Sequence, residues 1–206
     1  MPLHLVAHPL VDDVLAALRD RRTPSDEFRR LARRLSLLVA AEATRDLPTA
    51  EVEVETPLER ARVRRLTGRV VAVPVLRAGI GMLDAFLELV PTAHVGYFGL
   101  ERNETTAVAR RYYEKVPSDL ADAYVYLLDP MLATGGSAAL ALEGLAERGA
   151  RRVRLLSVVA APEGVSHLEQ AVPGAEIYAA ALDRGLNERK FILPGLGDFG
   201  DRLFGT

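Results

Sequence analysis

The hydrophobic pattern of the chain changes near residue 68. Before that point apolar residues recur at helical spacing, first in the short amphipathic stretch from Val11 to Leu18. A longer helix is predicted to start after the cap-like segment Thr23 to Asp26 and to end at Asp46 to Pro48. Glu51 to Glu55 then alternates polar and apolar residues, which predicts a half-exposed strand.

Beyond residue 68, continuous apolar runs alternate with helical patterns, as is typical of strands buried on both faces of a parallel sheet. The predicted strands are Val70–Val75, Val95–Phe98, Tyr124–Leu128, Val153–Ala160 and Ile177–Leu182. The predicted helices are Gly81–Val90, Ser137–Arg148 and Glu163–Val172. The alternation predicts an α/β fold with an open, doubly wound, mainly parallel sheet.

The length of 206 residues suits a single domain that spans residues 1–206. Within it we distinguish an N-terminal hood of helices and a strand at about 1–67, a core at about 68–183, and a glycine-rich tail at about 184–206. The hood carries an apolar helical stripe, which weakly favours a role in forming oligomers.

One segment does not fit the alternation. Leu100 to Pro117 is too long and too charged for a plain connection between a strand and a helix. Long ordered excursions of this kind are often functional lids or arms. We therefore expect a long β-hairpin arm here, and a solvated surface hairpin without a function is the alternative.

Composition excludes several classes of function. Hydrophobic residues make up 49% and charged residues 26%, as in ordinary globular proteins, and the net charge of −2 makes nucleic acid an improbable main partner. With no cysteines, a disulfide framework, a thiolate zinc site and a cysteine nucleophile are all ruled out. No apolar run is long enough to cross a bilayer, so we expect a cytoplasmic protein without a membrane partner.

The loop that follows the predicted strand Tyr124–Leu128 has the features of a phosphate-binding loop. It runs from Asp129 to Gly136 and enters a helix at Ser137. Its two glycines permit close approach of the backbone to an anion, hydroxyl groups add donors, and the helix dipole favours a phosphate. Asp129, at the strand end, could accept hydrogen bonds from vicinal sugar hydroxyls, so the loop predicts a site for a sugar phosphate.

A second loop of similar character follows the strand Val70–Val75. It contains Arg77, Gly79 and Gly81 and leads into the helix that begins near Met82. The glycines again expose backbone amides, and Arg77 could donate charge-assisted hydrogen bonds to a second anionic group. Taken alone, a GxG fragment is weak support for a ligand site.

The carboxyl-terminal segment Phe191 to Thr206 is expected to be too glycine-rich to form a helix. Gly195 to Gly200 formally satisfies GxGxxG, but no strand–helix–strand unit fits after it, so a dinucleotide site is rejected. The segment can instead offer closely approaching backbone N–H and C=O groups. A rigid main chain of this kind can read the pattern of hydrogen-bond donors and acceptors along one edge of a planar ligand.

Three motifs together resemble the uracil phosphoribosyltransferases, a branch of the type I phosphoribosyltransferases. They are D-P-M-L-A-T-G-G-S from Asp129, P-V-L-R-A-G-I-G-M-L-D from Pro74, and P-G-L-G-D-F-G-D-R-L-F-G-T from Pro194. Type I enzymes usually carry two adjacent acids in the first motif. Here Pro130 follows a single Asp129, which is the form of the uracil branch. In the third motif Phe199 stands where the family typically has alanine.

The resemblance implies a set of site residues. It places phosphoribosyl diphosphate (PRPP) against Arg77, Arg102, Asp129, Pro130, Met131, Leu132, Ala133, Thr134, Gly135, Gly136, Ser137 and Asp198. It places uracil against Ile192, Gly197, Asp198 and Phe199, with Phe199 contacting the base through its amide while its ring points elsewhere. Arg77, Arg102 and Asp198 would be the catalytic residues, and Asp198 is the one candidate for a general base.

The implied reaction transfers the 5-phosphoribosyl group from PRPP to uracil and yields uridine monophosphate (UMP) and diphosphate, a step of pyrimidine salvage. The implied cofactor is Mg²⁺, held mainly through PRPP oxygens and not by a dedicated set of protein ligands. A homodimer or larger homo-oligomer is expected from the resemblance. It also raises GTP as an effector, since some family members are activated by it.

Two alternatives remain at this point. A PRPP-sensing regulator could keep the fold but bind RNA or DNA, although the charge balance shows no basic recognition surface. A phosphoribosyltransferase for a purine or another pyrimidine would keep the PRPP loop but would not need the G-L-G-D tail. A doubly wound domain with incidental glycine loops would require three motifs to coincide by chance.

Overall fold

The computed structural model describes residues 3–102 and 109–206, and the side chains of Arg102 and Ala109 fall outside this description. Within these ranges nine strands form one central sheet. They are β1 (Leu3–Leu5), β4 (Arg69–Leu76), β5 (His94–Val95), β6 (Tyr97–Arg102), β7 (Ala109–Lys115), β8 (Ala123–Leu128), β9 (Met131–Leu132), β10 (Arg152–Ala160) and β11 (Glu176–Leu182).

The sheet is mostly parallel, in the order β1-β11-β10-β8-β4-β6-β7, with β5 beside β4 and β9 beside β10. The strands at its centre are apolar along nearly their whole length because both faces are covered. In β4 all six residues from Val70 to Val75 are buried, and β10 is buried from Leu155 to Ala160. An antiparallel pair, β6 and β7, closes one edge.

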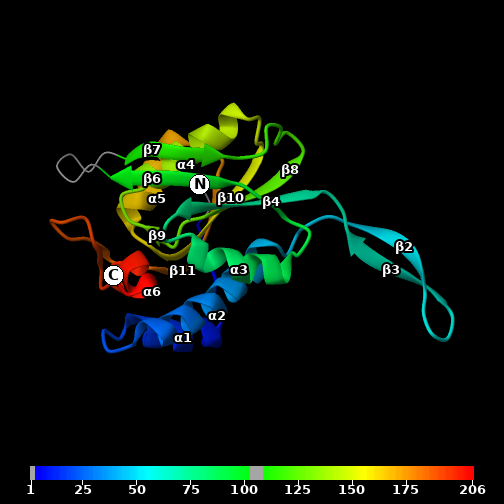
Figure 1. Cartoon of the computed structure of the whole chain (residues 1–206), viewed down its shortest axis with the longest axis horizontal. Coiled ribbons are helices and arrows are strands. Elements are labelled where there is room, and N and C mark those ends of the chain that lie inside the picture. Colours follow the sequence, from blue (N-terminus) through cyan, green and yellow to red (C-terminus); the bar gives the residue numbers. More distant parts are fainter. Residues whose placement is uncertain (1–2, 103–108) are drawn as a thin grey trace.

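Helices cover both faces of the sheet (Figure 1). The helices are α1 (Pro9–Arg19), α2 (Ser25–Ala43), α3 (Ile80–Leu89), α4 (Gly136–Glu147), α5 (Pro162–Ala171) and α6 (Phe199–Phe204). Buried side chains of α1, α2, α3 and α6 share one hydrophobic cluster, and those of α4 and α5 belong to a second cluster on the opposite face. The predicted doubly wound α/β fold is therefore confirmed.

Two small hairpins stand apart from the central sheet. The first, β2 (Thr49–Glu55) with β3 (Arg60–Leu66), projects as an arm away from the body (Figure 1). The sequence pattern indicates only β2, since the arginines of β3 obscure its alternation. The second pairs β12 (Gly185–Leu186) with β13 (Ile192–Leu193) and precedes α6.

The expectation that the tail forms no helix is wrong. Phe199–Phe204 forms the short helix α6, whose N-cap Asp198 accepts a hydrogen bond from the backbone N–H of Asp201 at 2.9 Å. Gly205 ends the helix in the left-handed conformation, with φ of 75°. Phe199 and Leu203 are both buried, at 1% and 4% exposure. Tertiary burial of this i, i+4 pair and good capping outweigh the low helix propensity of glycine.

The first half of the sheet also differs from expectation in two places. Val95–Phe98 is not one strand, because Gly96 separates β5 from β6 while its N–H bonds the carbonyl of Ala72 at 3.0 Å. The strand β1 has no counterpart among the predicted elements. It is three residues long and pairs with β11 in parallel, so the N-terminal segment contributes a strand to the main sheet.

The described residues of the segment Leu100 to Pro117 belong to an antiparallel strand pair at the edge of the sheet. The two strands pair from Tyr97 opposite Lys115 to Arg102 opposite Ala109, with an irregularity after Gly99. The strand pair is therefore continuous with the central sheet. Residues 103–108, which include most of R-N-E-T-T, lie outside the described ranges, so the predicted arm is not described there.

Candidate active site

Residues from the three motifs line one cavity of about 310 Å³ at the carboxyl ends of β4 and β8. This is where ligands bind in open α/β sheets, because strand ends and helix amino termini converge there. The lining residues are Val75, Leu76, Arg77, Ala78, Leu100, Asp129, Met131, Ala133, Ser137, Arg189, Lys190, Phe191, Ile192, Gly197, Asp198, Phe199 and Gly200.

The phosphate-loop motif connects β8 to α4 and meets the cavity at alternate points. Four of its predicted residues line the cavity: Asp129, Met131, Ala133 and Ser137. The remaining five, which do not line it, are Pro130, Leu132, Thr134, Gly135 and Gly136. The carbonyl groups of Pro130 and Leu132 accept hydrogen bonds from β10 and from Ala161, which fixes the loop on the neighbouring strand.

Gly135 explains why the loop needs glycine. It caps α4 with φ of 81°, a left-handed conformation that L side chains rarely adopt. A Cβ atom at this position would lie 2.9 Å from the carbonyl oxygen of Gly164 in α5. The phosphate loop is thus packed directly against the start of α5, and no described side chain caps the amino end of α4, which is the kind of end that favours an anion.

Arg77 sits between β4 and α3, after a cis peptide bond that joins it to Leu76. Its side chain is 61% exposed, and one guanidinium nitrogen lies 3.5 Å from the carboxylate of Asp201. The guanidinium also lies 5.9 Å from the ring centre of Phe204. The start of the second loop and the helix α6 of the tail are therefore in contact, which the sequence spacing of 124 residues could not show.

The tail contributes one wall of the cavity through Ile192, Gly197, Asp198 and Phe199. Gly197 has a φ of 82°, and Asp198 is exposed. The ring of Phe199 is buried, and its centre lies 5.2 Å from that of Phe28 in an edge-to-face arrangement. The ring packs into the core beneath α6, so a larger residue than alanine is accommodated on the side of the helix bundle.

A buried ion pair that sequence reasoning missed holds the tail in place. Asp183 follows β11, and its carboxylate accepts two hydrogen bonds from Arg19 of α1, at 2.7 and 2.8 Å. The same carboxylate accepts the backbone N–H of Gly195 at 2.8 Å, and Arg19 also donates to the carbonyl of Gly195 at 2.7 Å. We call this set of contacts the Asp183 clamp. It ties α1 to the backbone just before Gly197.

Arg202 of α6 provides a second anchor for the tail. Its guanidinium donates to the backbone carbonyl groups of Leu18, Asp20 and Leu196, at 2.5 to 2.8 Å. Burial lowers the pKa of this guanidinium, yet arginine stays charged at any physiological pH. Together with the Asp183 clamp, Arg202 fixes the glycine-rich backbone of the tail against the carboxyl end of α1.

One predicted cation lies outside the described side chains, and two cations that were not predicted line the cavity. Arg102 ends β6, and its side chain lies outside the described structure, so its predicted role stays a prediction. Arg189 and Lys190, by contrast, line the cavity although they belong to none of the three motifs. Their position a few residues before the third motif is the available signal, because binding residues are often found on loops.

In the described ranges, 3–102 and 109–206, no group of three or more His, Asp or Glu side chains is arranged to hold a metal ion. The cavity does present two carboxylates, Asp129 and Asp198. Oxygen donors of this kind suit Mg²⁺, which commonly takes only one or two protein carboxylates beside phosphate oxygens.

No helix of the described chain is long and apolar enough to span a membrane.

Comparison with known proteins shows which family the chain belongs to. The family model for uracil phosphoribosyltransferase matches residues 5–206. The chain belongs to the uracil phosphoribosyltransferase family. A uracil phosphoribosyltransferase of Symbiobacterium thermophilum is 51% identical over 203 residues, covering 98% of this chain and 97% of the relative. One of Lactococcus lactis is 49% identical over 205 residues, with 98% and 97% covered.

Solved structures agree with this fold. A protein of Aquifex aeolicus matches with a TM-score of 0.95 and 35% identity, over 100% of this chain and 99% of that one. A hypoxanthine-guanine phosphoribosyltransferase of Bacillus anthracis reaches a TM-score of 0.52 at 10% identity, over 77% of this chain and 80% of that one. The latter likeness shows the fold alone, which is that of the type I phosphoribosyltransferases.

Proposed function

We propose that this protein transfers the 5-phosphoribosyl group of PRPP to N1 of uracil and releases UMP and diphosphate. The observation that carries the proposal is the single cavity in which Asp129 and Ser137, Arg77, and Gly197 to Phe199 come together. These residues come from the three motifs that the resemblance connects with the sugar phosphate, the diphosphate and the base. Family membership across nearly the whole chain supports the same assignment.

For PRPP, we propose that the amino end of α4 binds the 5′-phosphate. Backbone N–H groups of the loop, with Gly135 in its left-handed conformation, and the hydroxyl of Ser137 would donate to phosphate oxygens. Asp129 would accept hydrogen bonds from the ribose hydroxyls. The remaining loop residues, Pro130 to Thr134 and Gly136, would hold the loop in shape or present backbone groups.

For uracil, we propose recognition mainly by backbone groups near Gly197. The base would lie against Ile192 and the amides of Asp198 and Phe199, with its O2, N3–H and O4 edge paired to main-chain groups. The Asp183 clamp and Arg202 support this proposal, because they hold the flanking backbone at Gly195 and Leu196 without using those main-chain groups of Gly197. Cytosine would leave a buried polar group unpaired, which disfavours it.

In the proposed reaction the bond between the anomeric carbon and the diphosphate oxygen breaks, and the bond from that carbon to N1 of uracil forms. The N1 proton leaves with solvent or through Asp198. Positive charge develops on the ribose and negative charge on the departing diphosphate. Arg77 and Arg102 would stabilise the leaving group, and the cavity would orient the two reactants.

We propose Mg²⁺ as the cofactor, bound chiefly through PRPP oxygens. When bound, the ion would neutralise part of the charge of the diphosphate. The carboxylates of Asp198 and Asp129 are the two cavity groups whose chemistry fits such an ion. Their role in this chain would be to hold the sugar and the metal side of PRPP in one orientation.

The proposal is tested by incubating the purified protein with PRPP, Mg²⁺ and each free base in turn. We expect UMP and diphosphate with uracil, and no nucleotide with cytosine, hypoxanthine or orotate. Asp129→Asn should raise the KM for PRPP by about tenfold, since a charged hydrogen-bond acceptor is lost. Asp122→Asn is the matched control, because Asp122 is exposed at the opposite end of the same strand.

Turnover of hypoxanthine or orotate without turnover of uracil would refute the assignment of the base. Equal PRPP kinetics in Asp129→Asn, Asp122→Asn and the unmodified protein would refute the role of the cavity. Binding of nucleic acid without any transfer would favour the regulator that the sequence left as an alternative.

We also propose a homodimer or larger homo-oligomer, built with the arm of β2 and β3. A hairpin of two strands is marginally stable in isolation, yet this one extends into solvent (Figure 1). One of its faces pairs Val52 with Val63 and Val54 with Ala61, and Leu58 near the tip is 96% exposed. An apolar face on a projecting arm is best explained by a second copy that covers it.

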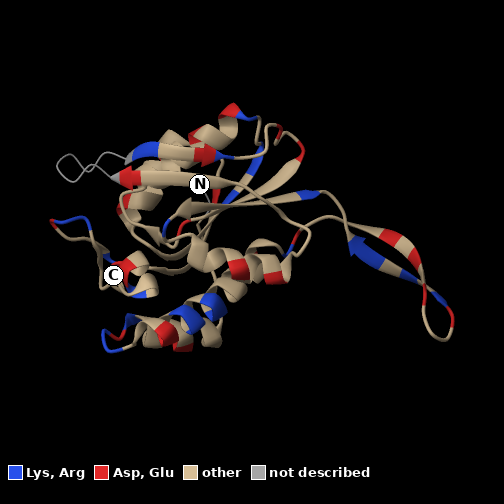
Figure 2. Cartoon of the chain, in the orientation of Figure 1, with Lys and Arg blue, Asp and Glu red and all other residues tan. Residues whose placement is uncertain are grey.

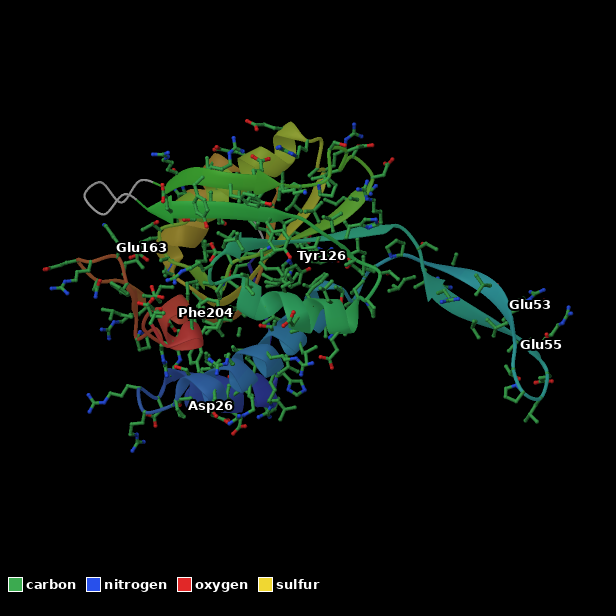
Figure 3. All side chains as sticks on the ribbon, viewed as in Figure 1. Asp26, Glu53, Glu55, Tyr126, Glu163 and Phe204 are labelled. Carbon is green, nitrogen blue, oxygen red and sulfur yellow. The ribbon has the colours of Figure 1, made fainter. Side chains whose placement is uncertain are left out.

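The opposite face of the arm is charged, with the glutamates of β2 opposite the arginines of β3 (Figure 2). Glu53 and Glu55 lie far from the body of the molecule in Figure 3. In sedimentation velocity, Val54→Asp should shift the assembly toward the monomer, whereas Glu53→Gln on the charged face should not. A protein that is monomeric before substitution, or an assembly unaffected by Val54→Asp, would contradict this use of the arm.

Two further expectations belong to the proposal. Activation by GTP, known from some family members, is tested by measuring turnover at limiting PRPP with and without GTP. A cytoplasmic location is tested by fractionating cells and assaying uracil-dependent UMP formation in each fraction.

A further inference from the structure

The turn between β12 and β13 places two cations at the cavity that neither the motifs nor the comparisons assign. Arg189 and Lys190 both line the cavity and are both exposed. Around them the turn closes on Asn187, whose side-chain oxygen accepts the backbone N–H groups of Arg189 and Phe191, each at 2.9 Å. The N–H of Lys190 bonds the carbonyl of Asn187 at 2.9 Å. The two cations are therefore carried by a closed turn with a defined shape.

Lys190 has an unusual backbone for its residue type. Its φ is 64°, and it is the one non-glycine residue with positive φ in the described part of the chain. This conformation costs an L-residue with a Cβ atom roughly 1–2 kcal/mol, and glycine would avoid that cost. Residues held in such regions cluster at ligand sites, where the surrounding structure imposes the conformation. A lysine at this position therefore lowers the stability of the protein relative to glycine. A ligand-binding role of its side chain in the cavity accounts for its presence.

The base of this hairpin is fixed to the helix that also supports the phosphate loop. The carboxylate of Glu163, in the first turn of α5, accepts the N–H of Leu186 at 2.9 Å. In the next position along α5, the carbonyl of Gly164 lies against Gly135 of the phosphate loop. Figure 3 shows Glu163 beside the hairpin. One helix therefore sets the position of both the hairpin and the loop relative to each other.

Within residues 3–102 and 109–206, neither Arg189 nor Lys190 forms an ion pair with an acidic side chain. Glu188 precedes the two cations in the chain, and Figure 2 accordingly shows both acidic and basic colours at the tip of the hairpin. The cavity also holds Arg77, while its acids are Asp129 and Asp198. The cations of the lining therefore exceed its acids by one, and they can pair with the oxygens of an anionic ligand such as a sugar phosphate with a diphosphate.

We propose that Arg189 and Lys190 are PRPP-binding residues, which contact phosphate oxygens of the substrate from the turn between β12 and β13. The proposal rests on the proposed function, in which PRPP is the substrate. It adds a further source of positive charge to Arg77, Arg102 and the amino end of α4. Uracil is neutral, so the two cations affect the affinity for PRPP and leave that for the base nearly unchanged.

The most informative variant is Lys190→Gly, because it separates two quantities. It should not lower the stability of the protein, yet it should weaken the binding of PRPP. Glycine relieves the left-handed strain, so the thermal stability should stay equal or rise. If the ammonium group binds a phosphate, the KM for PRPP should nevertheless rise by about tenfold, the equivalent of one charged hydrogen bond. The KM for uracil should stay within about twofold, and Arg189→Ala with Lys190→Gly should raise the KM for PRPP further.

Arg184→Ala is the matched control. Arg184 is an exposed cation near the base of the same hairpin and does not line the cavity. Its removal lowers the net charge by the same amount, so it should leave the KM for PRPP within about twofold of the unmodified value. An equal rise in Arg184→Ala and Lys190→Gly would overturn the proposal in favour of a general charge effect, as would the absence of any rise in Lys190→Gly.

A second measurement uses the scarcity of lysine, since the whole chain contains only Lys115 and Lys190. Acylation of both amines by an N-hydroxysuccinimide ester can be followed by peptide mass spectrometry. PRPP with Mg²⁺ should slow the acylation of Lys190 by about tenfold or more and leave Lys115, at the end of β7, unchanged. Equal acylation of Lys190 with and without saturating PRPP would overturn the proposal.

The two levels of inference fail in different ways. Unmodified protein that neither turns over nor binds PRPP would refute the proposed function together with this role. Unmodified protein that converts PRPP and uracil to UMP, while Lys190 stays unprotected and Lys190→Gly keeps its KM for PRPP, would refute the role of the hairpin alone.

Discussion

The Asp183 clamp predicts that one carboxylate outside the three motifs controls recognition of the base. Asp183→Asn keeps the size of the side chain but removes its charge. The side chain of Asp183 is 5% exposed and that of Arg19 is 24% exposed, so the substitution leaves an arginine largely buried without a counter-ion. It also weakens the acceptor for the N–H of Gly195.

The magnitude follows from these contacts. Removing one partner of a fully buried ion pair costs about 3–5 kcal/mol. Because a quarter of the Arg19 side chain remains solvated, we expect about 3 kcal/mol for the whole change, including the weakened hydrogen bond to Gly195. For a protein of this size that corresponds to a fall in Tm of roughly 6–12 °C.

The kinetic effect should be confined to the base. In this variant the backbone before Gly197 is held less firmly. Because a small displacement of the groups that bind a substrate can lower its affinity strongly, the KM for uracil should rise by about tenfold. The KM for PRPP should change by less than about threefold, because the phosphate loop on α4 keeps its own contacts. Initial rates with each substrate varied at saturating concentration of the other measure both values.

The control is Glu88→Gln, which breaks the exposed ion pair with Arg33 between α3 and α2 and should cost less than about 1 kcal/mol. A Tm of Asp183→Asn equal to that of Glu88→Gln would show that the clamp does not stabilise the fold. A large fall in Tm with unchanged KM for uracil would show that it is structural and has no part in base recognition.

Three further outcomes are expected. Gly135→Ala, with its forced left-handed φ and a Cβ 2.9 Å from a backbone oxygen, should raise the KM for PRPP at least about tenfold and lower the Tm. Phe199→Ala, which restores the residue typical of the family, should destabilise the protein by about 3–4 kcal/mol in chemical denaturation, because it empties the space beside Phe28; an unchanged midpoint would contradict this packing argument. The hydrogen bond from Arg154 lowers the pKa of Asp46, so the stabilisation is complete above the unfolded pKa and is lost as pH falls through the folded pKa. The difference in unfolding free energy between the unmodified protein and Asp46→Asn should therefore shrink as the pH falls below the ordinary pKa of an aspartate, and a constant difference would refute the linkage.

The fold class and the glycine-dependent conformation of the phosphate loop can be predicted from the amino-acid sequence. Strands buried on both faces must be continuously apolar, so β4, β8 and β10 are visible in the sequence with small errors at their ends. The glycines of the phosphate loop indicate a backbone conformation that other residues rarely adopt, which is why the sequence pattern includes Gly135 in the site.

Local sequence patterns predict secondary structure less well where tertiary burial determines whether a helix or strand forms. The helix α6 is hidden in the sequence because the low propensity of its glycine is a local property, whereas the packing of Phe199 against Phe28 joins residues from opposite ends of the chain. The strand β1 is hidden because three residues are too short for a pattern, and only its pairing with β11 makes it a strand.

Which side chains act together depends on the tertiary structure. The pair of Arg19 and Asp183 spans 164 positions, and a sequence of many arginines and acids does not indicate which of them will meet in a buried place. Likewise only the course of the turn after β12 brings Arg189 and Lys190 to the cavity. Sequence specifies conformation through local sterics and periodicity, but long-range ion pairs and the lining of a cavity depend on how distant elements pack against one another.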